Sequence, residues 1–251
     1  MAAGWQLYRL SPGMWTLVVV TWLVLTSLVN SIPYLGPVAT AIALPAFMVS
    51  FMSMCEELKH GRALRPSLLF DGFRRRPGPL LLLGTLNVLF ISAVLLVFWL
   101  FDSGAFMQSM NAAAQAARPS QEDVVTIYKG VFLILFLSTP VFAAFWFAPY
   151  LTAWDGMSPV KSMFYSFFAC LRNWRAFSVY SIAVFALVMA VGLVLSVFSV
   201  MLRIPPQAVG FKLAAALVTL PTLLASFYVA YRDIFPEAPA AAPAPESDVR
   251  A

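Results

Sequence analysis

Long uncharged stretches alternate with short polar segments along this chain, and each long stretch is apolar. No charged residue lies between Leu10 and Cys55, which leaves room for two membrane-crossing helices of about 20 residues and a turn. The turn falls at SIPYLGP, where proline and glycine interrupt helical structure. The pattern predicts a membrane domain over residues 1–235 and a disordered, Pro/Ala-rich tail over 236–251. Its six predicted spans cover about 13–31, 38–55, 80–101, 130–151, 177–201 and 213–231.

Composition agrees with this assignment. Hydrophobic residues make up 61% of the chain and charged residues 11%, whereas soluble domains carry about 25% charged residues. We therefore expect an all-α integral membrane protein. A cleaved signal peptide is the competing explanation of residues 1–41, but the apolar region is too long for one and no small-residue cleavage site follows promptly.

The chain offers few side chains for catalysis or metal binding. Two cysteines, Cys55 and Cys170, and the single histidine, His60, are too few and too far apart for a zinc site or a disulfide framework. No nucleotide-binding or hydrolase motif occurs, and the predicted spans hold no acidic or basic side chain that would mark an ion path. We expect no catalytic residues, no cofactor, no metal and no enzymatic activity.

Positive charge indicates the orientation. With the amino terminus in the cytoplasm, 12 Lys and Arg residues fall on the cytoplasmic side, and Arg118, Lys129, Arg203 and Lys212 fall outside. Lys and Arg near span ends are retained in the cytoplasm, so both termini are predicted to lie there. Nucleic acid is not an expected partner, because no basic face exists apart from the loops.

The segment from Ser158 to Trp174 has the periodicity of an amphipathic helix. Ser158 and Pro159 suit its start, and Lys161 and Arg172 fall opposite the apolar side. The apolar stripe consists of Val160, Met163, Phe164, Phe167, Leu171 and Trp174. The helix is predicted to lie in the membrane interface, with its aromatics at the acyl boundary and its cations among anionic headgroups. Packing against the cytoplasmic underside of the protein is the alternative.

A spacing of 3, 4 and 3 residues recurs before each odd-numbered span. The three sets are Trp5, Tyr8, Pro12 and Trp15; Phe70, Phe73, Pro77 and Leu80; and Phe167, Cys170, Trp174 and Phe177. Arginine lies in or near each set. The candidate interfacial anchors are therefore Trp5, Tyr8, Arg9, Phe70, Phe73, Arg74, Arg75, Arg76, Phe167, Arg172 and Trp174.

The even-numbered spans share a mid-span proline. These candidate kinks are Pro45, Pro140 and Pro221, and a carboxylate follows each span at Glu56, Asp155 or Asp233. A proline inside a helix removes a backbone hydrogen bond and bends the helix. Together with the recurring spacing, this predicts three repeated units, each an interfacial helix followed by a helical hairpin.

Several motifs resemble those of an uncharacterised family of multi-pass inner-membrane proteins from proteobacteria. They are GWQLYRLSPGMW, IPYLGP and FAPYLTAWDGMSPVKSMFYSFFACLRNWRAFSVY, and the similarity covers nearly the whole chain except the tail. More loosely, the chain is similar to YciC-like proteins and to the membrane domain fused to some glycerophosphodiester phosphodiesterases, whose hydrolase activity is not expected here. The resemblance implies a location in the bacterial inner membrane and no established activity.

Three functions remain open. We favour a non-catalytic scaffold or accessory protein that engages anionic membrane lipids and a protein partner or a second copy of itself. Transport of a lipid or small molecule would be favoured by a cavity lined by Asn87, Pro45, Pro140 and Pro221. A membrane enzyme acting on lipid headgroups would be favoured by a cluster of Asp71, Asp155 and Asp233 with arginines.

The alternation of spans can be tested by labelling. A single cysteine introduced into residues 56–79 should react with a membrane-impermeant maleimide from the cytoplasmic side, and one in residues 102–129 from the opposite side. This result is expected because the Lys and Arg residues of 56–79 are retained in the cytoplasm and a single predicted span, 80–101, separates the two segments. Labelling of both segments from the same side would contradict the predicted topology.

Overall fold

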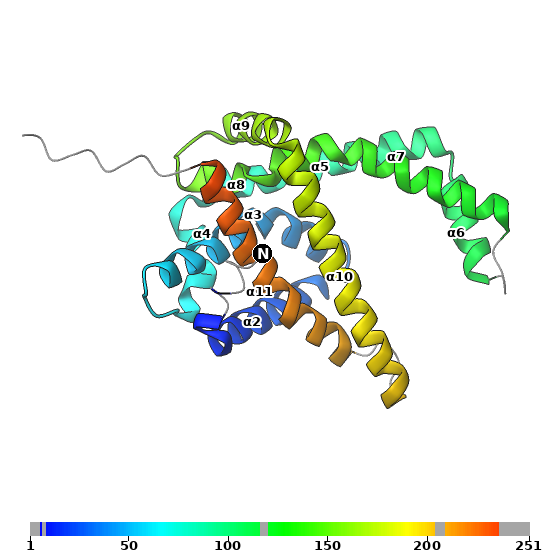
Figure 1. The fold of residues 1–251 in the computed structure, drawn as a ribbon. Coiled ribbons are helices and arrows are strands. Elements are labelled where there is room, and N and C mark those ends of the chain that lie inside the picture. Colours follow the sequence, from blue (N-terminus) through cyan, green and yellow to red (C-terminus); the bar gives the residue numbers. More distant parts are fainter. Residues whose placement is uncertain (1–5, 7–8, 116–119, 204–208, 236–251) are drawn as a thin grey trace, which may run out of the picture.

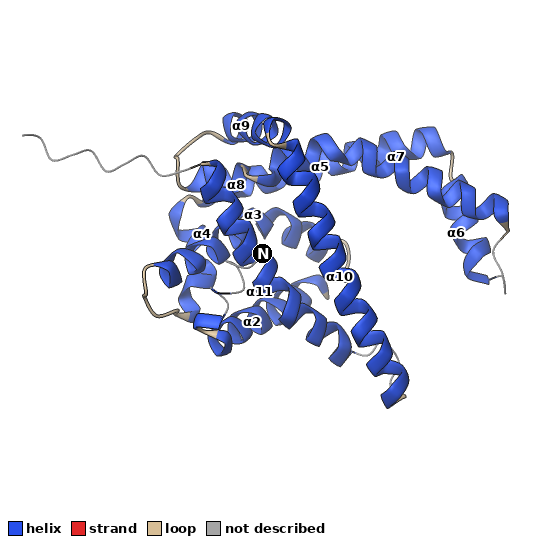
Figure 2. Ribbon diagram, in the orientation of Figure 1, coloured by secondary structure: helices blue, strands red, loops and turns tan. Residues whose placement is uncertain are grey.

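The computed structural model describes residues 6, 9–115, 120–203 and 209–235, with the backbone alone for 209–216, 218 and 221. Within these ranges the chain is helical and contains no strand (Figure 2), which confirms the all-α prediction. The elements are α2 (Pro12–Asn30), α3 (Leu35–Lys59), η1 (Pro66–Phe70), α4 (Asp71–Arg75), α5 (Pro77–Asp102), α6 (Ala105–Gln115), α7 (Gln121–Trp146), α8 (Ala148–Ala153), α9 (Pro159–Arg172), α10 (Trp174–Leu202) and α11 (Val209–Ile234). The predicted tail over 236–251 lies outside the described residues.

Five helices in the described part of the chain are long and apolar enough to cross a membrane: α2, α3, α5, α7 continued through α8, and α10. They match the first five predicted spans closely, except that α7 begins at Gln121, where Ser120 Oγ accepts a hydrogen bond from the Asp123 N–H (3.1 Å) and caps the helix. The multi-pass class is thus confirmed. α11 covers the sixth predicted span, and the count of six remains a prediction.

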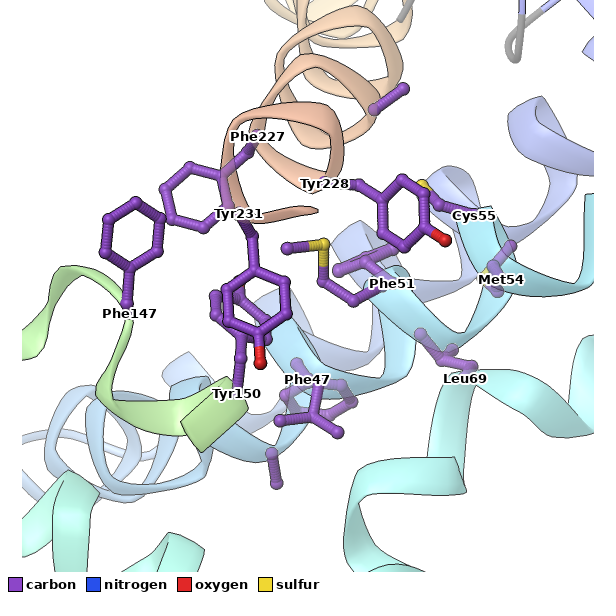
Figure 3. Packing of buried hydrophobic residues seen from close by; sticks show 14 of the residues in the cluster. Phe47, Phe51, Met54, Cys55, Leu69, Phe147, Tyr150, Phe227, Tyr228 and Tyr231 are labelled. Carbon is purple, nitrogen blue, oxygen red and sulfur yellow. The ribbon is translucent and has the colours of Figure 1, made fainter. Parts of the chain in front are cut away.

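α3 lies at the centre of the packed part of the molecule. Its C-terminal half packs against α2, α4, α5, α8 and α11. The buried residues there are Ala46, Phe47, Val49, Ser50, Phe51, Met52, Ser53, Met54, Cys55 and Leu58. In Figure 3, Phe51 and Cys55 of α3 lie beside Tyr228 of α11. A helix that is apolar on all sides is buried on all sides, and α3 organises the fold for this reason.

The other spans are much more exposed. α5 and α7 pair with each other and extend away from α2, α10 and α11 (Figure 1). Within α10, Ser199 alone is buried, and large side chains such as Phe185 and Leu193 are exposed. Phe132 and Phe136 of α7 are exposed in the same way. Apolar surface of this extent is what a bilayer, rather than water, would cover.

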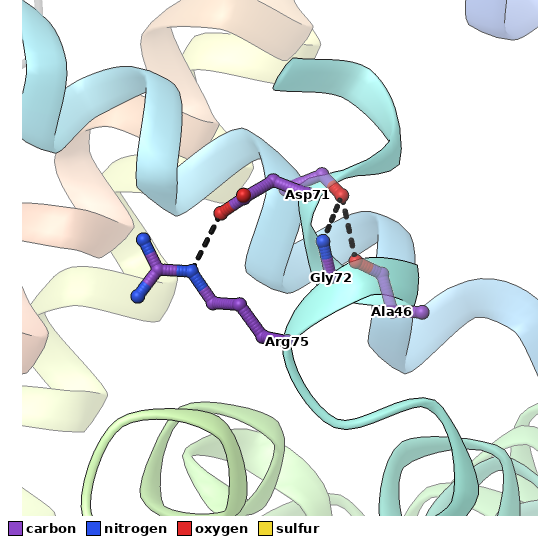
Figure 4. Close-up of polar contacts among 5 residues, drawn as sticks. Ala46, Asp71, Gly72 and Arg75 are labelled. Atoms are coloured by element: carbon purple, nitrogen blue, oxygen red, sulfur yellow. Dashed lines mark hydrogen bonds and ion pairs between the residues drawn. The ribbon is translucent and has the colours of Figure 1, made fainter. Parts of the chain in front are cut away.

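Two glycines allow neighbouring backbones to touch α3. A Cβ atom on Gly84 of α5 would collide with the carbonyl oxygen of Ile42, and one on Gly72 of α4 would collide with that of Ala46. Small residues commonly permit such close approach between membrane helices. Ser50 completes the second contact: its hydroxyl accepts from the Gly72 N–H (2.9 Å) and donates to Ala46 O (3.0 Å) (Figure 4).

The fourth span is interrupted at Phe147, between α7 and α8. Pro149, the second residue of α8, has no N–H and its ring crowds the preceding turn. Ser166 of α9 repairs the interruption: its hydroxyl accepts from the Phe147 N–H (2.9 Å) and donates to Ala143 O (2.7 Å). The side chain therefore sits between two groups that would bond directly in a continuous helix.

The three predicted kink positions are all helical. Pro45 lies inside α3 and Pro140 inside α7, and Pro221 falls within the bounds of α11. Bending at these prolines remains a prediction. The fourth span has, in addition, a break at Phe147, two residues before Pro149.

The predicted amphipathic helix forms as α9, but the face that packs against the protein consists of small side chains. Ser162, Ser166 and Cys170, spaced by four residues, are buried. The large apolar side chains face outward, and Val160, Phe164, Phe168 and Leu171 are all exposed. Pro159 is the first helical residue, as predicted, whereas the Ser158 hydroxyl makes no capping hydrogen bond.

The helix starts follow the spacing that recurs in the sequence. Pro12, Pro77 and Trp174, each third in its set, are the first residues of α2, α5 and α10. The fourth members Trp15 and Leu80 are fully buried, and Phe177 packs against the same core. This agreement is what a repeat would produce, and the threefold repeat itself remains a prediction.

The close contact at Gly84 can be tested by adding one methyl group. Gly84→Ala should lower the free energy of unfolding by about 1–3 kcal/mol, because the new Cβ has to displace backbone of α3. Thermal unfolding of the detergent-solubilised protein, followed by tryptophan fluorescence, measures the change. Gly192→Ala in α10 is the matched control, since its Cβ would meet nothing within 4 Å. Equal melting temperatures for the two variants would contradict the contact.

The packed face of α9 predicts an unreactive thiol. Cys170 Sγ lies 3.5 Å from Ala143 O, and burial raises the pKa of this thiol to about 12. Because the thiolate is the reactive species, alkylation near pH 8 should be roughly a thousandfold slower than at an exposed cysteine. Peptide mapping after N-ethylmaleimide treatment measures the rate, with Lys161→Cys as an exposed control on the same helix. Similar rates at the two positions would show that α9 does not pack through this face.

Candidate functional site

The main polar cavity lies where α3, α8 and α11 end. We call it the polar cleft; its volume is about 620 Å³. Its charged residues are Glu56, Arg75, Asp155 and Arg232, and its aromatic residues include Trp154, Tyr165 and Tyr231. A cavity of this size accommodates a small molecule or a lipid headgroup.

Arg232 and Glu56 form the ion pair that joins α11 to α3. The Arg232 guanidinium donates to Glu56 Oε1 at 2.9 Å, and the two side chains are only 17% and 21% exposed. The guanidinium also lies over the rings of Trp154 (5.4 Å) and Tyr228 (5.7 Å). Partial burial strengthens the ion pair and the cation–π contacts relative to a pair in open water.

Aromatic rings form the floor beneath this pair. Tyr150 is buried against Phe227 (5.4 Å between ring centroids) and Tyr231 (5.5 Å), and Phe147 lies 5.6 Å from Phe227. Figure 3 shows these rings between α8 and α11. Each such pair contributes about 0.5–1.5 kcal/mol beyond its burial, so this end of α11 is held firmly.

The two remaining charged residues of the polar cleft have different partners. The Asp155 carboxylate accepts a hydrogen bond from the Tyr231 hydroxyl (3.2 Å). Among the residues that the structure describes, no cation forms an ion pair with Asp155. Arg75 Nε donates to Asp71 Oδ2 at 2.7 Å (Figure 4).

Arg76 bonds backbone carbonyls inside the protein, a role that the sequence did not indicate. Its Nη1 donates to Thr152 O (2.9 Å) and to Met157 O (3.4 Å), at the end of α8 and in the loop that follows. Carbonyls at the end of a helix lack partners within the helix. Arg76 supplies one, and it thereby connects the start of α5 to the wall of the polar cleft.

The predicted carboxylate cluster is only partly present. Of Asp71, Asp155 and Asp233, Asp155 alone lines the polar cleft, while Asp71 pairs with Arg75 beside it. Asp233 lines two smaller cavities instead. Glu56 and Arg232 were missed as members of the cluster, although Glu56 had been noted as a carboxylate that follows an even-numbered span. Among the described residues, no group of three metal-ligating side chains could hold a metal ion.

The predicted anchors occupy different environments. Arg9, Arg74, Arg172 and Trp174 are exposed, and Phe167 is half-buried. Phe70 is 41% exposed, whereas Phe73 packs 4.9 Å from Phe47 in the core. Trp5 and Tyr8 lie outside the described residues. Arg75 and Arg76 make the contacts given above.

A second cavity, of about 430 Å³, lies between α10, α11 and the end of α7. We call it the apolar groove. Its lining includes Trp146, Val184, Val188, Leu220, Leu224 and Phe227. Asn87, Pro45 and Pro140, expected around a transport cavity, are absent from the described lining of this groove, and the Pro221 side chain lies outside the described residues.

Comparison with known proteins identifies a relative along nearly the full length. The chain is 32% identical over 238 residues to a Burkholderia thailandensis protein named "Probable inner membrane protein BTH_II0599", with 92% of this chain and 88% of the relative covered. No protein-family profile matches the chain. No solved structure matches it either. Identity at this level over this share of both chains, together with the apolar helices, shows that the chain belongs to a family of multi-pass inner-membrane proteins of unknown function.

Proposed function

We propose that this protein is a non-catalytic scaffold or accessory protein of the bacterial inner membrane. It crosses the membrane six times with both termini in the cytoplasm, and α11 is its sixth span. Its cytoplasmic surface engages anionic lipid and offers an attachment site to a protein partner or a second copy. The looser likeness to YciC-like proteins is compatible with this proposal and adds no activity to it.

The orientation of α9 carries the proposal. This helix packs on α7 and α8 through Ser162, Ser166 and Cys170, and turns Phe164 and Phe168 outward. A helix on a water-covered surface would show the reverse arrangement, with its large apolar side chains packed. An outward aromatic face fits the boundary between headgroups and acyl chains. The proposal therefore joins the two interpretations of this segment from the sequence. One side of the helix packs on the protein, and the opposite side faces the membrane interface.

Cations accompany the outward face. Lys161 and Arg172 of α9 are exposed, and Arg175 lies 5.6 Å from the centre of the Trp174 ring. Each cation near an anionic leaflet contributes about 1 kcal/mol to attraction. Arg74 is exposed too, whereas Arg76 is engaged by backbone carbonyls. Lipid attraction is therefore assigned to Arg74, Lys161 and Arg172, and Arg76 is assigned to the fold.

The polar groups at this end of the molecule support a structural rather than a catalytic role. Thr152 Oγ1 donates to Ser162 Oγ (2.8 Å), and Ser162 donates in turn to Ser158 O (3.0 Å). Ser166 and Arg76 bond backbone groups, and Glu56 pairs with Arg232. Most hydroxyls and charges here thus connect helices.

Depth measurements test the position of α9. Nitroxide labels at Phe164→Cys and Phe168→Cys should be accessible to oxygen and shielded from a water-soluble nickel chelate in liposomes, because both side chains enter the acyl boundary. A label at Ala63→Cys, in the exposed loop between α3 and η1, should show the opposite preference. Equal chelate access at all three positions would mean that α9 lies in water.

Charge reversal tests the lipid attraction. Lys161→Glu with Arg172→Glu should reduce the enrichment of anionic lipid around the purified protein several-fold, given about 1 kcal/mol for each cation removed. Mass spectrometry of lipids in native nanodiscs measures the enrichment. Lys129→Glu, on the predicted outer side, is the control and should leave it unchanged. Enrichment that survives the double reversal would contradict the proposed role of these cations.

A further inference from the structure

The polar cleft and the apolar groove follow one another along α11. Leu220, Leu224 and Phe227 line the groove, and Tyr231 and Arg232 line the cleft. A third cavity, of about 210 Å³, shares Trp146 and Tyr180 with the groove and Ile234 with the cleft. Three cavities therefore follow one another along α11, from the apolar groove to the polar cleft.

The dimensions fit half of a bilayer. From Leu220 to Arg232 there are 12 residues, which correspond to about 18 Å of α-helix. One leaflet of the hydrocarbon core is about 15 Å thick. The groove and the cleft together therefore extend over about the depth of one leaflet, with the groove lining from Leu220 to Phe227 and the polar end at Arg232.

The charge balance of the cleft indicates what its polar end would bind. Its lining includes Arg232, which is paired with Glu56, and Arg75, which is paired with Asp71 beside the cleft. Asp155 lines the same cavity without an ion pair to a described cation. A purely anionic ligand would be attracted by the arginines and repelled by Asp155, whose described partner is the neutral Tyr231 hydroxyl. A ligand with a cationic group for Asp155 and an anionic group for the guanidinium N–H groups avoids this repulsion.

The types of side chain agree with a phosphate and an ammonium group. Guanidinium groups bind phosphate oxygens through paired N–H donors. A carboxylate beside aromatic rings binds an ammonium group, which gains from ionic attraction and from the ring faces. Asp155 lies beside Trp154 in the chain, and Tyr165 and Tyr231 line the same cleft.

We propose that the protein binds one zwitterionic phospholipid of the phosphoethanolamine class in this composite site. The phosphate lies toward Arg75 and Arg232, the ammonium group toward Asp155, and an acyl chain lies in the groove between α10 and α11. Of α9, the described cleft lining includes Tyr165 and not Phe164 or Phe168, and the site does not depend on the anionic-lipid role assigned to that helix.

Lipid titration of the delipidated, full-length protein tests the proposal. Native mass spectrometry should show one phosphatidylethanolamine bound per chain, at least tenfold tighter than phosphatidylglycerol with the same acyl chains. Asp155→Asn keeps the shape of the cleft and removes the negative charge, so the preference should fall to within about twofold. Glu57→Gln, a carboxylate paired with Arg62 outside the described cleft lining, should leave the preference unchanged.

Variants of the groove distinguish binding of a whole lipid from binding of a soluble headgroup. Val184→Trp should fill the groove and reduce binding at least tenfold, whereas Val194→Trp, on the exposed side of the same helix, should bind normally. Soluble phosphoethanolamine should not displace the lipid at equal concentration. Thermal unfolding of each variant shows whether it is folded.

Several outcomes would overturn the proposal. They are the absence of a bound phosphatidylethanolamine on the folded wild-type protein, equal binding of phosphatidylglycerol, and an unchanged preference in folded Asp155→Asn. Displacement by soluble phosphoethanolamine would exclude the acyl-chain role of the groove. The α9 variant Arg172→Glu, outside the described cleft lining, should leave this site occupied, so failure of the α9 proposal and failure of this one are distinguishable.

Discussion

Backbone groups that cannot reach water must find partners inside the protein, and this requirement accounts for the most specific contacts of the structure. A continuous helix satisfies its own groups, so the demand arises only where a helix starts, stops or breaks. Side chains supply the missing hydrogen bonds: Ser50 to the N–H of Gly72, Ser166 to the N–H of Phe147, and Arg76 to the carbonyl of Thr152. Each of these side chains comes from a different element than the group it serves. The hydrogen bonds that permit irregular backbone therefore also fasten the helices together.

Much of the fold follows from the sequence because hydrocarbon imposes a length on every span. Uncharged runs near 20 residues located the five apolar helices, and SPVKSMFYSFFACLR gave α9. Which face of α9 packs could not be predicted, since a stripe of Ser162, Ser166 and Cys170 has no hydrophobic signal. The helix break at Phe147 was not predicted for a related reason: Pro149 stands near the end of the apolar run, where it resembles an ordinary boundary.

The polar cleft was harder to predict, because its members come from five separate segments. The carboxylates Glu56 and Asp155 were visible as residues that end a span, and both do line the cavity. At the end of α11, Arg232 lines the cleft and the predicted Asp233 does not. Successive helical residues point about 100° apart, and it is Arg232 that faces Glu56 of α3. Composition showed few charges, and the structure brings four of them together at this cleft: Glu56, Arg75, Asp155 and Arg232.

The hydroxyl inserted between Phe147 and Ala143 has a consequence for how the chain is made. Ser166 lies 19 residues beyond the amide that it serves, so a ribosome delivers the fourth span to the membrane before its partner has been synthesised. Until α9 emerges and docks, that amide and its carbonyl are exposed at the edge of the lipid. The second half of the protein thus contributes to completing the first, and a nascent chain that stops short of α9 would present an unfinished helix to the quality-control machinery of the cell.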